Sequence, residues 1–97
     1  MIMNLNPTEL LSAMSHPLRL AILHRLSKGT CCVEALGELL SAPQPNISQH
    51  LRLLLDSGLV QVERRGRRRC YSLSDKRIKR FLKILEDMTI ESADKIV

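Results

Sequence analysis

The sequence predicts one mainly α-helical domain with a small β-hairpin. Along most of the chain, apolar residues recur at intervals of three and four, which gives a helix one apolar face. Between residues 60 and 73 the interval falls to two, which is typical of half-buried strands. Because 97 residues are too few for two independent cores, residues 1–97 are expected to form a single domain, with loose ends at 1–5 and 92–97.

Charge and cysteine usage narrow the class of protein. The formal net charge is +5, and nine of the fifteen Lys and Arg residues lie between Arg64 and Arg80, which suits an anionic partner. No apolar run approaches the roughly 20 residues of a membrane-spanning helix, and the N-terminus has no signal-peptide pattern. The three cysteines include no CxxC pair, which favours a reducing cytoplasm over a secreted disulfide framework.

Two helices are expected before the first break in the pattern. The first begins after Asn6, with Pro7 in its first turn and Glu9 placed to complete a capping box. The second runs over about 17–27 and ends in a basic residue and a glycine, as helix C-termini prefer. Residues 30–32 are too few for a helix and are expected to form a brief strand.

Residues 42–58 carry the clearest functional pattern. A third helix over about 33–41 and a fourth after the break at Ala42-Pro43 form a helix-turn-helix pattern. The apolar face of the fourth helix consists of Ile47, Leu51, Leu54 and Leu55. Its opposite face and first turn carry polar groups suited to reading base edges in a DNA major groove, namely Gln44, Asn46, Ser48, Gln49 and Arg52. His50, beside this face, either contacts a DNA phosphate or borders the core.

Residues 60–73 are expected to form a hairpin with a strongly basic tip. Val60 and Val62 alternate with polar residues, as do Tyr71 and Leu73, and Gly66 lies at the turn. Five arginines surround that glycine: Arg64, Arg65, Arg67, Arg68 and Arg69. Because these charges repel one another, we expect an anion beside them, either the DNA phosphates or a narrow minor groove.

A last helix, capped by Ser74, follows the hairpin. Its apolar stripe is large for a terminal helix, so a second copy of the chain is expected to cover it. The stripe consists of Ile78, Phe81, Leu82, Leu85 and Met88. The element order α-α-(β)-α-α-β-β-α is that of a winged helix-turn-helix, in which the hairpin is the wing.

Four stretches are specific in combination, because they occur in a characteristic order and spacing. They are Ser-His-Pro-Leu-Arg-Leu-Ala-Ile-Leu at 15–23, Gln-Pro-Asn-Ile-Ser-Gln-His-Leu at 44–51, Ser-Gly-Leu-Val at 57–60, and Arg-Arg-Gly-Arg-Arg-Arg-Cys-Tyr-Ser-Leu at 64–73. Together they resemble the small ArsR/SmtB-type repressors over roughly residues 8–90. The resemblance implies a homodimer joined through its first and last helices, which adds Leu10, Leu11 and Met14 to the expected interface residues. It also implies that the dimer binds an operator and is released by an inducer. One departure is Pro43, where the family usually has a Ser or Thr N-cap.

The sensing site that the resemblance implies is only partly matched. The family's metal site on the closing helix needs Asp and His ligands, and the closing helix here has no His. Some arsenic-sensing members carry Cys-Val-Cys at the start of the third helix, where this chain has Cys31, Cys32, Val33 and Glu34. If the short strand pairs with the returning wing strand, residues 30–32 would lie beside residues 70–72, and Cys70 could face Cys31, Cys32 or both. Three thiolates suit trivalent arsenic or antimony, and two could form a disulfide, although cysteine is often simply a small buried residue.

The sequence thus predicts a cytoplasmic, homodimeric DNA-binding repressor of the thiol-sensing, arsenic-responsive-like branch. It would need no cofactor for DNA binding, and trivalent arsenic or antimony acting on Cys31, Cys32 and Cys70 would release it. Two related alternatives stay open: a repressor that responds to thiol oxidation or reactive sulfur, and an effector-blind DNA-binding regulator. The alternative of another class is a basic helical module that binds an acidic protein or RNA. An enzyme is not predicted, because no nucleophile, base and oxyanion hole are arranged for catalysis.

Overall fold

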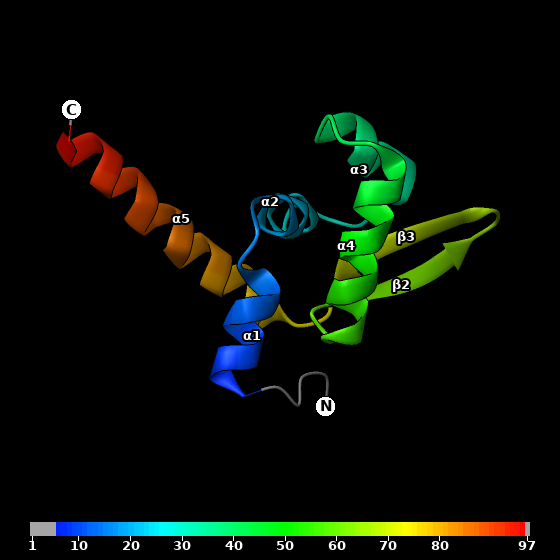
Figure 1. Ribbon diagram of the computed structural model, residues 1–97, viewed down its shortest axis with the longest axis horizontal. Helices are drawn as coiled ribbons and strands as arrows, with labels where there is room; N and C mark the ends of the chain where they lie inside the picture. Colours follow the sequence, from blue (N-terminus) through cyan, green and yellow to red (C-terminus); the bar gives the residue numbers. More distant parts are fainter. Residues whose placement is uncertain (1–5, 97) are drawn as a thin grey trace.

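The structure, a computed structural model, describes residues 6–96 of the chain. Its elements, in chain order, are α1 (Pro7–Met14), α2 (Pro17–Leu26), β1 (Cys31–Cys32), α3 (Val33–Leu39), α4 (Gln44–Asp56), β2 (Val60–Arg65), β3 (Arg68–Leu73) and α5 (Lys76–Ile96) (Figure 1). This order confirms the predicted mainly α-helical, winged helix-turn-helix fold.

The three strands form one antiparallel sheet in the order β1-β3-β2. Gly66 begins a two-residue turn between β2 and β3 with φ of 66°, a left-handed conformation that glycine adopts without steric cost. β1 pairs with the returning strand β3, with Cys31 opposite Tyr71 and Cys32 opposite Cys70. The predicted pairing of the short strand with the wing is therefore confirmed.

The core lies where α2 passes between α5 on one side and the α3–α4 pair on the other (Figure 1). It is aliphatic, as expected of a sequence with one Phe and one Tyr. The largest side chains that it encloses completely are Ile22, Leu23, Leu36, Ile47, Leu51, Leu54, Leu59 and Leu82. Ile47, Leu51 and Leu54 come from one face of α4, so the core fixes which face of that helix looks outward.

The N-cap residue agrees with the prediction from the sequence at α1 and differs from it at α5. At α1 the capping box forms, because Glu9 N donates to Asn6 Oδ1 over 2.8 Å and Asn6 N donates to Glu9 Oε1 over 3.2 Å. At α5 the prediction that Ser74 is the cap was wrong, because Asp75 accepts from Arg77 N over 2.8 Å. The guanidinium of Arg77 pairs with the same carboxylate over 2.6 Å, an interaction that serine cannot make, and it holds the pKa of Asp75 at about 2.

Helix α5 extends away from the body of the molecule toward Ile96 (Figure 1). Residues 92–96 are therefore helical, whereas a loose end was predicted for 92–97. The helix continues because no glycine or proline lies between Lys76 and Ile96 to end it. The expectation for residues 1–5 and 97 lies outside the described residues. Although α5 has 21 residues, neither it nor another helix within residues 6–96 is apolar enough to cross a membrane.

Candidate nucleic-acid interface and the thiols beside it

Helix α4 begins without a side-chain cap, and the local sequence compensates for it. Pro43 is the N-cap residue and makes no side-chain cap hydrogen bond, in line with the departure seen in the sequence. Its carbonyl accepts from Asn46 N over 3.0 Å and from Ile47 N over 3.1 Å. Pro45 has no backbone N–H. The backbone N–H of the exposed Gln44 is therefore the one donor of the first turn that hydrogen-bonds to solvent and not to the helix. The helix can therefore start at Gln44, as the sequence predicts, although Ser or Thr is missing.

The polar face of α4 is fully open to solvent. The five residues predicted to read bases, Gln44, Asn46, Ser48, Gln49 and Arg52, are all exposed, while the opposite face is sealed in the core. Arg52 Nε lies 3.5 Å from Asp56 Oδ1, one turn further along the helix. This ion pair is highly exposed, so it stabilises the helix little and can be exchanged for another anion.

The wing projects beside α4 (Figure 1), and four of its five arginines lie in like-charge pairs. Arg64 is directly opposite Arg69, and Arg65 is directly opposite Arg68. Like charges directly opposite one another destabilise an antiparallel pair of strands. Only one of the five has an acidic partner within residues 6–89, because Arg65 Nη2 lies 3.3 Å from Glu63 Oε1. The hairpin therefore carries exposed positive charge that the described part of the chain does not neutralise.

The sheet brings two of the three thiols together and keeps the third apart. Residues directly opposite in an antiparallel pair share a face, so Cys32 and Cys70 lie on one face of the sheet. Cys31 and its partner Tyr71 point to the other face and belong to the hydrophobic core. The expected cluster of three thiols is thus not formed, because neighbouring strand residues alternate in direction. Within the described residues, no three His, Cys, Asp or Glu side chains are grouped as metal ligands.

The surroundings of the thiols also differ. A hydrogen bond with Cys32, followed by burial, raises the pKa of the Cys70 thiol above its ordinary value. Burial raises the pKa of the Cys31 thiol, which makes that core cysteine less reactive. Cys32 is half-buried and is the N-cap residue of α3, the first helix of the helix-turn-helix, although its side chain makes no cap hydrogen bond.

The comparisons with known proteins agree with this geometry. Residues 14–63, from the end of α1 to the first wing strand, match the family described as a helix-turn-helix domain. The chain is 45% identical over 67 residues to the HTH-type transcriptional repressor SmtB of Mycobacterium tuberculosis, covering 69% of this chain and 50% of that protein. It is 37% identical over 67 residues to the arsenical resistance operon repressor of Staphylococcus xylosus, covering 69% and 64%. The chain belongs to the ArsR/SmtB-type repressor family.

The fold of this ArsR/SmtB-type chain also has a solved counterpart. The homodimeric winged helix-turn-helix DNA-binding domain of a Mycobacterium bovis protein superposes with a TM-score of 0.83 at 25% sequence identity, over 91% of this chain and 82% of that one. The family consists of transcriptional regulators, which confirms the prediction that the chain is not an enzyme. The chain spans about half the length of the SmtB relative that it matches.

The eight side chains predicted to join two copies of the ArsR/SmtB-type chain divide into two groups. Met14, Ile78 and Leu82 pack in the core of the chain itself, and Leu10 and Leu85 are partly buried. The exposed members are Leu11, Phe81 and Met88.

A further exposed apolar residue of α5, Ile84, was not among the predicted interface residues; its side chain is 59% exposed. It follows Phe81 by three residues and precedes Met88 by four, so the same periodicity contained the signal for a second stripe beside the first. α5 therefore has one apolar stripe for its own core and another that the described residues leave open.

His50, which the sequence left between two roles, is half-buried at the edge of the polar face of α4. Its Nδ1 lies 3.2 Å from Nη1 of Arg19, and its ring centroid lies 4.4 Å from that of His16. Burial, followed by His16 and Arg19, lowers the pKa of His50 below its ordinary value. The imidazole is therefore neutral at pH 7, and no pattern near residue 50 indicates the contact with Arg19.

Proposed function

We propose that the protein is a homodimeric DNA-binding transcriptional repressor. The observation that carries the proposal is the exposed polar face of α4 beside a wing in which four of the five arginines have no acidic partner among the described residues. In this arrangement Gln44, Asn46, Ser48, Gln49 and Arg52 read base edges in the major groove. The wing arginines Arg64, Arg65, Arg67, Arg68 and Arg69 bind phosphates or enter the narrow minor groove. Family membership supports this assignment.

A second copy of the chain is the proposed occupant of the exposed apolar residues. Four large apolar side chains of α1 and α5 are between 42% and 61% exposed: Leu11, Phe81, Ile84 and Met88. Single exposed apolar residues are normal on a monomer, whereas a group of them indicates an interaction surface. The related domain from Mycobacterium bovis is described as homodimeric. A symmetric dimer would read two half-sites about one helical turn of DNA apart, or a small multiple of that. Ile84→Glu should give monomers in sedimentation analysis and abolish tight operator binding.

We also propose an inducer that acts on Cys32 and Cys70, most simply trivalent arsenic or antimony. Soft thiolate ligands select soft ions and metalloids, and a relative is an arsenical resistance operon repressor. Arsenous acid, As(OH)₃, would form one As–S bond with each thiol and release two waters, keeping one hydroxyl. The bridge would tie the start of α3 to strand β3 of the wing. It lowers DNA affinity only if it binds the DNA-incompetent shape better than the competent one.

Thiol oxidation is the second candidate signal, because Cys32 and Cys70 are register partners. The α-carbons of directly opposite residues in an antiparallel pair are about 4.5–5.5 Å apart, within the range that a disulfide spans. A peroxide would take two electrons from the two thiols, giving the disulfide and two molecules of water or alcohol. Free cysteines of this kind fit the reducing cytoplasm that the sequence predicts.

The test uses the full chain and a duplex selected by it from a random-sequence pool. Binding to that duplex and to a shuffled version is measured by fluorescence anisotropy over a salt series, with an RNA duplex and polyglutamate as competitors. The account predicts strong preference for the selected duplex and a steep loss of affinity with salt. Equal binding to shuffled DNA, RNA or polyglutamate would instead favour the basic interaction module.

The inducer is tested on the same duplex with arsenite, antimonite and a peroxide. Release should be lost in Cys32→Ser and Cys70→Ser and kept in Cys31→Ser, which is the matched control because Cys31 faces the core. Release by peroxide but not by arsenite would identify a redox sensor. If no agent changes the affinity, the effector-blind regulator is the better description.

A further inference from the structure

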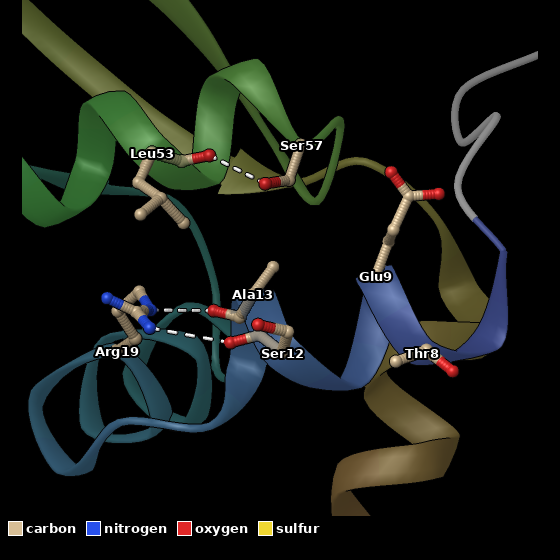
Figure 2. A pocket seen from close by; sticks show the side chains of 7 residues that line it. All are labelled: Thr8, Glu9, Ser12, Ala13, Arg19, Leu53 and Ser57. Carbon is tan, nitrogen blue, oxygen red and sulfur yellow. Dashed lines mark hydrogen bonds between the residues drawn. The ribbon is translucent and has the colours of Figure 1, made fainter.

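Arg19 joins the end of α1 to the rest of the molecule through its guanidinium group. Its Nε donates to the carbonyl of Ala13 over 2.7 Å, and its Nη2 donates to the carbonyl of Ser12 over 3.4 Å. Figure 2 shows both hydrogen bonds at the edge of a pocket of about 420 Å³ between α1 and α4. The last carbonyls of a helix have no partner within the helix, and α1 has no basic residue in its own last turn. Arg19 therefore acts as the C-terminal cap of α1.

The same guanidinium reaches the reading helix α4. Its Nη1 lies 3.2 Å from Nδ1 of His50. Arginine is always a donor and is never deprotonated in proteins, so Nδ1 of His50 must be the acceptor. An imidazole whose Nδ1 accepts a hydrogen bond carries its proton on Nε2. The geometry thus assigns the neutral Nε2–H tautomer to His50.

The neighbouring histidine is held in the same way. Nδ1 of His16 accepts a hydrogen bond from the amide of Leu18 over 3.0 Å, so His16 caps α2 as an Nε2–H tautomer. Its ring stacks at a tilt of 38° against that of His50. The groups that face His50 are therefore His16, from the loop before α2, and Arg19, from α2. A proton on Nδ1 of His50 would break the hydrogen bond from Arg19, and protonation of both ring nitrogens would also place two cations side by side.

The second nitrogen of His50 is open to an external partner. Within residues 6–89, Nε2 of His50 makes no hydrogen bond, and no buried side-chain nitrogen or oxygen lacks a partner, so Nε2 is in contact with solvent. His50 follows Asn46 by one helical turn, on the flank of the exposed polar face of α4. If the polar face of α4 enters a groove, an N–H on its flank would lie near the border of that groove, where the phosphates are.

We propose that Arg19 is a positioning residue for DNA binding, which holds His50 as a neutral donor whose Nε2–H binds a backbone phosphate. This rests on the proposed function, because it assumes that the polar face of α4 enters a groove. The contact is unusual in a basic interface, because a neutral donor releases no counterion when it binds phosphate. It should therefore add affinity without adding to the salt dependence, and it should be the same for every sequence.

The first test does not involve DNA. Long-range ¹H–¹⁵N correlation spectra of the full chain should show the His50 ring with its proton on Nε2 at pH 7. In Arg19→Met, which keeps the aliphatic stem, that pattern should change to a mixture of tautomers, and the pKa of His50 should rise. Arg25→Met is the matched control, because Arg25 lies on the same helix and its side chain makes one hydrogen bond among the described residues, from Nη1 to the carbonyl of Gly29.

The second test compares two substitutions of His50 on a selected duplex. The side-chain amide of asparagine lies near the position of the histidine Nδ1 and does not reach that of Nε2. His50→Asn should therefore lower affinity about tenfold for selected and shuffled DNA alike. Gln reaches the Nε2 position, so His50→Gln should retain most of the affinity. In neither variant should the slope of affinity against salt change.

Three results would overturn the proposal. They are a His50 ring that carries its proton on Nδ1 or is charged at pH 7, an Arg19→Met spectrum identical to the parent's, and a salt slope that falls by about 0.9 in His50→Asn. The wild-type spectrum decides the tautomer even if Arg19→Met fails to fold. A chain that shows the expected tautomer and binds no DNA would contradict the proposed function alone.

Discussion

Four arginines of the wing and Arg19 of the helical body have opposite surroundings. Arg64, Arg67, Arg68 and Arg69 make no side-chain hydrogen bond or ion pair among the described residues. The register sets Arg64, Arg68 and Arg69 opposite other arginines, and Arg67 lies in the turn. In the body, Arg19 donates to two carbonyls and to His50. Arg19 therefore helps to hold the helices together, whereas these four wing arginines are available to an anion.

This difference has an energetic reason. An arginine that has exchanged its hydration for hydrogen bonds inside the protein stabilises the folded state and is costly to remove. An exposed arginine opposite another arginine contributes nothing favourable to folding, so its presence is better explained by binding. The wing is thus the region where function, rather than folding, accounts for the residue type.

The largest expected effect comes from removing unpaired wing charges. Replacing Arg67, Arg68 and Arg69 together by alanine should weaken binding to a selected duplex about 100-fold at moderate salt, because each phosphate that arginine neutralises releases a counterion. The slope of log affinity against log salt should fall by about 0.9 for each phosphate that is no longer neutralised. Anisotropy titrations over a salt series measure both quantities.

The matched control removes the same charge from another place. Lys76, Lys79 and Lys83 are exposed on α5, and their triple alanine variant loses three charges away from the wing. It should change affinity only slightly. Equal losses in the two triple variants would mean that net charge, not the wing, attracts the DNA.

The next effect tests the other side of the comparison. Arg19→Met should lower the free energy of unfolding by about 2 kcal/mol, because the carbonyls at the end of α1 lose charge-assisted hydrogen bonds. Arg68→Met, in the wing, should change it by less than about 0.5 kcal/mol. Urea unfolding at matched protein concentration compares the two. A wing variant that is as destabilised as the Arg19 variant would refute the division between the two kinds of arginine.

Local patterns in the sequence were enough for most of the fold and for the exposure of the polar residues of α4 that we propose to face DNA. The capping box of Asn6 and Glu9, the turn at Gly66 and the polar face of α4 all depend on residues within a few positions of one another. The pairing of Cys32 with Cys70 required the topology as well, because only the return of β3 beside β1 brings them together. The alternation of strand side chains then separates Cys31 from them.

Other features depend on packing that no local pattern encodes. Arg19 and His50 are 31 positions apart, and each looks like an ordinary helix residue until α2 and α4 are packed. Ile84 lies on a second stripe of α5 that became distinct only when Ile78 and Leu82 were found in the chain's own core. The cap at Asp75 was missed because Ser74 is an equally good capping residue by type.

A smaller effect concerns base reading rather than charge. Gln49→Ala should lower affinity for the selected duplex about tenfold and leave affinity for shuffled DNA unchanged, because a missing hydrogen-bonded pair to a base costs about 1–3 kcal/mol of discrimination. Glu34→Ala, exposed on α3, is a control for general effects on the helix-turn-helix. A uniform decrease for both duplexes would assign Gln49 to the DNA backbone.

The smallest effect concerns Arg77, an exposed arginine of the body that is paired with the carboxylate of Asp75. Because the pKa of Asp75 is held at about 2, below its ordinary 3.8, the folded state binds this proton less readily than the unfolded state. The stabilisation from Asp75 should therefore be complete above about pH 4 and lost as the pH falls through 3.8 toward 2. Thermal unfolding of the parent and of Asp75→Ala should differ at pH 6 and converge near pH 2. A constant difference would show that the carboxylate charge is irrelevant.

The most direct test of the central claim is an NMR titration of the full chain with a selected duplex. The account predicts that amide shifts concentrate on residues 44–52 of α4 and 64–69 of the wing, and that α5 changes little. Shifts centred on α5, or the same shifts with an acidic polymer, would contradict the assignment of this surface to DNA.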